Sequence, residues 1–190
     1  ERLMSIPGSA SPLFIGAAAG AAAAFQIDRS LRFNSGDGAY LSRTPSSTGN
    51  RRTFTLSGWV KRSSLGTQRP IFSTYAGAHP TTALVFNGDD NLWFFDYNSS
   101  YNLQLVTSAR FRDPGAWMHF VVAVDTTQAV EANRVKIYIN GEQVVSAFNT
   151  STYPSPSFQF DWNSQTEHNI GKHVNNLDGY LAELYSIDGQ

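Results

Sequence analysis

The chain has 190 residues, 41% of them hydrophobic, which suffices for one sizeable core and is too short for two full domains. Its formal net charge is -1, from 14 Lys and Arg against 15 Asp and Glu, and this balance argues against nucleic acid or an anionic membrane surface as a partner. The sequence contains no cysteine, which excludes a disulfide framework, thiol catalysis and metal sites built on thiolates.

The N-terminal segment differs in composition from everything that follows it. Pro7, Gly8 and Pro12 interrupt the backbone, and residues 13–25 form an uncharged run dominated by alanine and glycine. The run is shorter than the ~20 residues that span a bilayer, so we expect no membrane span. We interpret residues 1–27 as an arm or anchor. Three readings of its run stay open: a secretory signal with Ala-x-Ala triplets, a short helix docked on a partner subunit, or a tether.

From Ser30 onward, short apolar runs recur between turn residues at the spacing of an antiparallel sandwich rather than of βαβ units. We therefore expect one all-β domain over residues 28–190. The expected strands cover residues 30–34, 39–42, 53–61, 70–75, 82–87, 91–97, 102–107, 117–124, 134–140, 142–148, 168–171 and 177–186. Residues 149–157, rich in Ser, Thr and Pro, are expected to form the longest loop.

The clearest element is the hairpin that follows the apolar strand at residues 117–124. Apolar and polar residues alternate with period two over residues 134–140, and the pattern resumes beyond the turn. Asn140 and Gly141 supply two residues that tolerate positive φ in a tight turn. The pattern predicts an antiparallel hairpin.

Four segments, in their order along the chain, resemble the laminin-G-like domains of the concanavalin A-like lectin/glucanase superfamily. They are SLRFNSGDGAYLS at 30–42, TFTLSGWVKRSS at 53–64, WMHFVVAVD with its VKIYINGEQV hairpin at 117–144, and HNIGK with LDGYLAELYSIDG at 168–189. The resemblance covers residues 30 to 189. It implies a jelly-roll sandwich of two antiparallel sheets, preceded here by the Ala/Gly-rich arm.

A second resemblance concerns residues 4–47, which are similar to the N-termini of tailed-bacteriophage virion proteins that carry a lectin-like domain. It implies a place in a virion, in a tail fibre or knob or as a capsid decoration. The partners it implies are other virion proteins, further copies of the chain in a homo-oligomer, and a glycan on the host surface. Similar proteins continue past the segment at residues 187–189, so a longer polypeptide is expected.

Hydrolases of this superfamily need two carboxylates about 5 to 5.5 Å apart, and the resemblance places them in one strand as Glu-x-Asp-x-x-Glu. The chain has no such string. Glu183 is five residues from both Asp178 and Asp188, a spacing that puts the partners on opposite faces of a strand. The histidines, at positions 79, 119, 168 and 173, lack metal-binding spacing. We assign no catalytic residue and expect a protein that is not an enzyme.

A turn of oxygen-rich residues, Asp89, Asp90 and Asn91, connects two expected strands. Carboxylate and carbonyl oxygens are the ligands that calcium prefers, and the resemblance implies calcium at a loop rim in many laminin-G-like domains. We therefore name these three residues as a candidate calcium site. The alternative is a solvated hairpin tip.

Sugar binding on a β-sandwich combines an exposed aromatic ring with amides and carboxylates that bond the hydroxyl groups. The aromatic residues expected in or near loops with such neighbours are Trp93, Tyr97, Tyr101, Tyr153 and Trp162. They are the candidate carbohydrate-binding residues. The alternative for the two tryptophans is that they fill the core.

The sequence thus predicts a non-enzymatic structural protein of a tailed-phage virion, with a lectin-like domain for assembly and for attachment to host glycans. The alternative from another class is a secreted, extracellular bacterial carbohydrate-binding module, for which the N-terminal run would be a cleaved signal. A third reading, a glycoside hydrolase, lacks the carboxylate pair that it needs.

Overall fold

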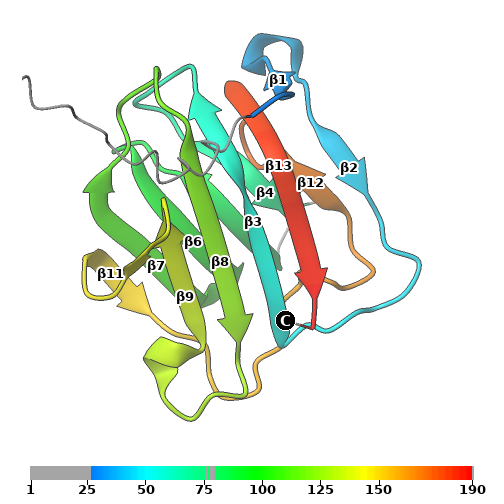
Figure 1. Cartoon of the computed structure of the whole chain (residues 1–190). Coiled ribbons are helices and arrows are strands. Elements are labelled where there is room, and N and C mark those ends of the chain that lie inside the picture. The colour runs from blue at the N-terminus through cyan, green and yellow to red at the C-terminus, as the bar shows by residue number, and fades with distance from the viewer. Residues whose placement is uncertain (1–26, 76, 78–79, 190) are drawn as a thin grey trace, which may run out of the picture.

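The structure is a computed structural model that describes residues 27–75, 77 and 80–189. The described chain folds into two antiparallel sheets that pack face to face (Figure 1). From edge to edge, sheet A contains β1 (Leu31–Phe33), β13 (Gly179–Asp188), β3 (Thr53–Arg62), β8 (Met118–Asp125), β9 (Val135–Ile139) and β10 (Glu142–Val144). Sheet B contains β11 (Phe148–Thr152), β7 (Ser100–Arg110), β6 (Asn91–Asn98), β5 (Thr81–Phe86), β4 (Arg69–Ser73), β12 (His168–Ile170) and β2 (Leu41–Arg43). The predicted all-β sandwich is confirmed.

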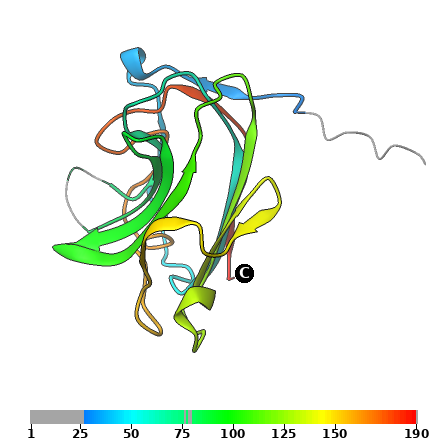
Figure 2. The same cartoon turned by 90° about the vertical axis from the view of Figure 1, so that its left-hand side faces the viewer.

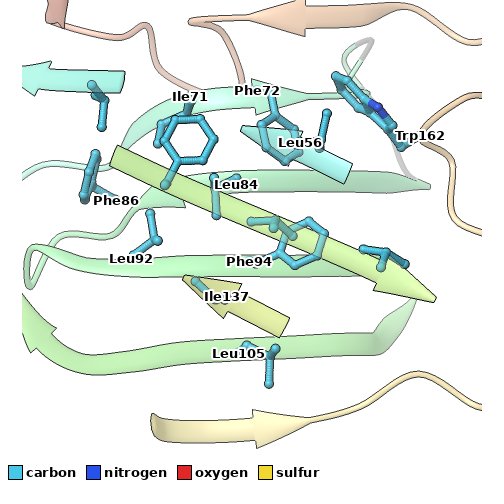
Figure 3. Close-up of a cluster of buried hydrophobic side chains, with 14 of the residues drawn as sticks. Leu56, Ile71, Phe72, Leu84, Phe86, Leu92, Phe94, Leu105, Ile137 and Trp162 are labelled. Atoms are coloured by element: carbon cyan, nitrogen blue, oxygen red, sulfur yellow. The ribbon is translucent and has the colours of Figure 1, made fainter. Parts of the chain in front are cut away.

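The main core lies between the sheets and is built from the inward-facing side chains of both. On β3 and β8, buried and half-buried residues alternate, and the strands pair in register over residues 53–60 and 118–125. Aromatic rings fill the centre, where the centroid of the Phe94 ring lies 6.1 Å from that of Phe72 and 6.2 Å from that of Phe160. Figure 3 shows this cluster, including Trp162 at its border. Packing of this kind stabilises the domain without disulfides.

Sheet B buries side chains on its outer face as well as toward the core. Every residue of β5 is buried, and so is most of β6. Ala83, Val85 and Phe95 form a second buried apolar cluster, and Trp93 and Tyr97 pack against it. Alternate residues of a strand point to opposite faces, so this second cluster lies on the outer face of sheet B.

β11 occupies part of a segment, residues 149–157, for which the sequence predicts a loop. The strand predicted for residues 142–148 is shorter than expected and ends at Val144. β11 pairs with the edge of β7, where Thr150 lies beside Val106. Because the backbone partners come from a strand distant in sequence, tertiary pairing overrides the local composition.

Gly171 joins β12 to the loop that follows it and has a φ of 79°, in the left-handed region that favours glycine. A Cβ atom at this position would lie 2.6 Å from the ring of Phe33. We expect Gly171→Ala to lower the free energy of unfolding by about 1–3 kcal/mol, because backbone strain and the contact both oppose alanine. Urea denaturation measures the loss. The control is Gly66→Ala, which has a φ of 70° and no atom within 4 Å of the added Cβ. Equal losses for the two variants would argue against the Phe33 contact.

No helix among the described residues is long and apolar enough to cross a membrane. The arm predicted for residues 1–27 lies, apart from Ile27, outside the part of the chain that the structure describes. The division into an arm and a domain over residues 28–190 stays a prediction.

Candidate functional site

An aromatic cluster lies on the outer face of sheet B, over β6 and the start of β7. We define it by Trp93, Phe95, Tyr97 and Tyr101. The ring centroids of Trp93 and Phe95 are 4.4 Å apart. The Tyr101 ring lies 4.9 Å from that of Tyr97, 6.0 Å from that of Trp93 and 6.2 Å from that of Phe95. The four rings therefore form one contiguous surface patch.

The aromatic cluster follows from the alternation along β6. Leu92 and Phe94 point into the main core, whereas Trp93, Phe95 and Tyr97 belong to the outer face. A contiguous patch of large apolar side chains on an outer face is a common feature of binding surfaces. Within the aromatic cluster, Tyr101 is exposed, Trp93 and Tyr97 are half-buried, and Phe95 is buried.

The aromatic cluster has a buried floor and an exposed rim. Phe95 is 3% exposed, while Tyr101 is 40% exposed. Figure 2 shows the hairpin end of β6 and β7 turning away from sheet A, toward the side on which the loop at residues 171–178 also projects. His173 of that loop contacts the floor, with its ring centroid 5.6 Å from that of Phe95. The rings thus lie on a curved face bordered by a hairpin and a loop.

Polar groups accompany the rings. Gln104 is half-buried and lies directly opposite Phe95 in the β6–β7 pairing, so its amide shares the outer face. The Nε1 atom of Trp93 is buried and has no hydrogen-bond partner among the described residues, and the same holds for Oδ1 of Asn169. Nδ2 of Asn169 donates to the carbonyl of Tyr75 (2.9 Å). An unpaired buried polar atom is costly, so these two atoms are points of local strain.

Behind the aromatic cluster, on the inner side of β6, lies the buried carboxylate of Asp96. It accepts hydrogen bonds from Oγ1 of Thr82 (2.7 Å) and from Nδ2 of Asn102 (3.0 Å). Burial, with a smaller contribution from the nearby charge of Asp161, raises the pKa of Asp96 to about 6 against the lowering effect of these two bonds. Asn102 directly follows Tyr101, so the bond to Asp96 ties β6 to β7 beneath the exposed rim.

The sandwich matches a known protein family along most of its length. Residues 33–187 match the family Laminin_G_3, described as the concanavalin A-like lectin/glucanases superfamily. The chain belongs to this family. The matched range includes the whole aromatic cluster. A comparison with curated proteins finds no match.

Three solved structures share the fold of this concanavalin A-like domain. A heptameric SAP-like pentraxin from Limulus polyphemus is 15% identical, with a TM-score of 0.56 over 83% of this chain and 74% of the pentraxin chain. Domain 4 of the extracellular arabinanase AbnA from Geobacillus stearothermophilus, solved with arabinotriose, is 18% identical, with a TM-score of 0.56 over 85% and 82%. Domains LG4-5 of the mouse laminin alpha1 chain are 8% identical, with a TM-score of 0.57 over 84% and 41%. At these identities the likeness shows the fold alone.

The structure of this concanavalin A-like domain brings together Trp93, Tyr97 and Tyr101, three of the five residues predicted to bind carbohydrate. It does not bring the other two to the same place. Trp162 is 3% exposed and belongs to the main core, and Tyr153 packs against that core just after β11. Sugar binding by any of the five stays a prediction.

Sequence reasoning missed Phe95 and Asp96. Phe95 lies two positions from both Trp93 and Tyr97, so the period of two along the strand could have placed it with them. Asp96 carries no local signal, because its hydrogen-bond partners come from the neighbouring strands β5 and β7.

The turn predicted as a calcium site has a structural role in the domain. The Asp90 carboxylate accepts bonds from the guanidinium groups of Arg62 and Arg112, both at 2.9 Å, and from the Gly66 N–H at 2.8 Å. Burial opposes the ionisation of Asp90, but these three bonds outweigh it and lower its pKa. No group of three or more His, Asp or Glu that could hold a metal ion occurs among the described residues. Calcium at Asp89, Asp90 and Asn91 stays a prediction, and the ion would compete with two arginines for Asp90.

A separate cleft of about 500 Å³ opens between β2 and the end of β13. His168, in its lining, accepts a bond from the Asn163 N–H (2.9 Å), and its Nδ1 lies 2.8 Å from the Thr166 carbonyl. This pattern fits a neutral ring with its proton on Nδ1, and burial lowers the pKa of His168. Asp188, the carboxylate among the described lining residues, accepts a bond from the Asn50 N–H (2.7 Å). These bonds hold loops in place, and the lining lacks the two carboxylates of a glycosidase.

Proposed function

We propose that the domain binds carbohydrate without chemical conversion, and that its binding surface is the aromatic cluster. The observation that carries this proposal is the contact of four aromatic rings on one outer sheet face, outside the main core. The C–H face of a sugar ring packs on such rings, which supply large apolar area with little loss of side-chain entropy.

Polar groups support the same reading. Hydroxyl groups of a sugar need donors and acceptors beside the stacking surface. Gln104, half-buried opposite Phe95, supplies an amide on the outer face beside the rings. The fold accommodates oligosaccharides in other proteins: domain 4 of the arabinanase was solved with arabinotriose, and the CBM40 of the Ruminococcus gnavus sialidase with sialyllactose (14% identity, TM-score 0.50, 78% of this chain and 90% of that one).

The test is a glycan array probed with the wild-type chain and with Tyr101→Ala. We expect about fivefold weaker binding for the variant, since an aromatic contact contributes ~1 kcal/mol. Tyr185→Ala is the matched control, because Tyr185 is another exposed tyrosine, 54% accessible, on the distant strand β13. Wild-type chain that binds no glycan, or equal losses for the two variants, would overturn the proposal.

We further propose that the domain acts on a tailed-phage particle, as part of a tail fibre or knob or as a capsid decoration. The resemblance of residues 4–47 to phage virion proteins supports this setting. Neighbouring virion proteins and further copies of the chain would hold it in the particle, and multiple copies would turn weak single-site affinity for a host glycan into firm attachment.

Mass spectrometry of purified particles tests the setting. Peptides that cover residues 4–29 should be present in the virion fraction. A soluble secreted product cleaved near Ala24 would contradict the virion proposal and favour the alternative, a secreted bacterial carbohydrate-binding module.

A further inference from the structure

We propose that residues 13–25 of a second copy of this chain dock as an added strand on the open edge of β13, beside a groove between the two sheets. This inference specifies the contact between copies that the virion proposal assumes, and it needs no part of the carbohydrate site.

The β13 edge that faces β1 is covered over only part of its length. β1 pairs with Gly179 to Leu181, whereas β3 accompanies the opposite edge as far as Asp188. Residues 183–188 therefore have no strand partner on the β1 side among the described residues. An uncovered edge presents a row of backbone N–H and C=O groups, which is a template for pairing with another chain.

β13 of sheet A lies beside β2 and β12 of sheet B (Figure 1), and a groove lined by residues of these strands lies along the open edge. We call it the seam groove. It comprises the 500 Å³ cleft and a second cavity of about 820 Å³, which share Leu41 and Ile170 in their linings. The second cavity is lined mainly by apolar residues: Leu31, Phe33, Leu41, Ile170, Leu181, Ala182 and Leu184.

Large apolar side chains remain exposed around the seam groove and the open edge. Leu31 is 56% exposed, Leu41 51%, Leu184 37% and Ile187 43%. β13 also has a bulge here, with a register shift between Ala182 and Tyr185. Beyond the bulge β13 pairs regularly with β3, so its free edge is straight enough to accept a strand. A backbone template beside an apolar groove fits an extended peptide that lacks charge.

The chain contains such a segment. No charged residue occurs between Leu3 and Ile27, and residues 13–25 combine small Ala and Gly side chains with Leu13, Phe14, Ile15 and Phe25. Extended, residues 13–25 would span about 43 Å at 3.3 Å per residue, about twice the ~20 Å of the open edge. Small side chains suit a shallow groove, and the larger ones would fill the apolar cavity.

The path of residues 27–30 favours a second copy over the same chain. Continuing the β1 register would carry these residues along the free edge of β13, yet they form no strand. Asp28, Arg29 and Ser30 line the 820 Å³ cavity without pairing with β13, and the pairing of β1 with β13 begins at Leu31. Figure 2 shows residues 27–30 leading away from both sheets. Reciprocal exchange of arms across a two-fold axis would cover both edges at once.

Cross-linking of the full chain tests this contact. The sequence has no cysteine, so Ala22→Cys and Ile187→Cys each introduce a single thiol. The two variants, one of them tagged, are mixed and treated with a short bis-maleimide. We expect a cross-linked dimer that contains both variants. The control replaces Ile187→Cys by Val145→Cys, a residue 72% exposed that follows β10 on the opposite edge of sheet A. If the yield of the Ala22→Cys and Ile187→Cys dimer is no higher than that of the Ala22→Cys and Val145→Cys dimer, the proposal is overturned.

Light scattering supplies a second test. The molar mass of the wild-type protein in solution should be twice the 20.9 kDa mass of one chain. The variant Ile187→Lys should have the mass of one chain, because a charge at the edge opposes strand addition. Its circular dichroism spectrum should equal that of the wild type. A wild-type chain that is monomeric in solution would overturn the proposal. The same holds if the arm of that monomer cross-links to the β13 edge of its own molecule. Glycan binding by the wild-type chain is independent of either result.

Discussion

Asp90→Ala is expected to lower the free energy of unfolding by about 3–5 kcal/mol, which is the usual cost of removing one partner from a buried ion pair. Arg62 and Asp90 are both 4% exposed and pair at 2.9 Å. Without the carboxylate, the Arg62 guanidinium would keep its bond to the Phe111 carbonyl and lose its compensating charge. The Gly66 N–H would lose its acceptor as well. Urea denaturation at neutral pH measures the loss.

Asp89→Ala is the matched control, because Asp89 precedes Asp90 in the same turn and has an exposed side chain. This variant should lie within about 0.5 kcal/mol of wild type, as is usual for surface substitutions. A similarly small effect for Asp90→Ala would show that the Arg62 pair contributes little to the stability of the fold.

Asp96→Asn is expected to raise the free energy of unfolding at pH 7, by up to about 3 kcal/mol for the difference between a pKa of about 6 in the folded state and the ordinary 3.8. The folded state favours the protonated form of Asp96, so it binds more protons than the unfolded chain between these two values. The contribution of Asp96 to stability is therefore greatest below pH 4 and declines as pH rises through 6. Asparagine stays neutral at every pH. The Asn102 amide can rotate to accept a bond from it, while Thr82 keeps its own bond.

Urea titrations of wild type and Asp96→Asn at pH 4, 5.5 and 7.5 test this expectation. The difference between the two should be smallest at pH 4 and grow toward pH 7.5. Asp89→Asn, at an exposed position, should follow wild type at all three values. An Asp96→Asn variant that is less stable than wild type by the same amount at every pH would show that the charged carboxylate is needed.

Much of the fold could be predicted from local pattern. The alternation over residues 134–140 and the turn residues after it predict the β9–β10 hairpin, and Asn140 and Gly141 do adopt positive φ values of 51° and 87°. β11 could not be predicted in this way. Its short, Ser- and Thr-rich stretch becomes a strand because the long strand β7 offers a free edge, which no local window shows.

The candidate site was predictable in part. Trp93 and Tyr97 are separated by an even number of positions along β6, so the sequence alone predicts that they point to the same face of the strand. The sequence does not show which face of sheet B is the outer one. Nor does it show that Trp162, which follows a polar residue in a turn-rich segment, turns its ring into the core. The support beneath the rings depends on the pairing of Asp96 with two other strands, which only the folded register establishes.

The central claim, that the aromatic cluster binds carbohydrate, is tested most directly by the indole N–H resonances of the four tryptophans during titration with the strongest binder of the glycan array. The Trp93 resonance should shift in proportion to saturation, because the sugar packs against the ring cluster that contains this indole, while those of Trp59, Trp117 and Trp162 stay in place. A shift of the Trp162 resonance with an unchanged Trp93 would instead place the sugar in the cleft beside β13 and contradict the account.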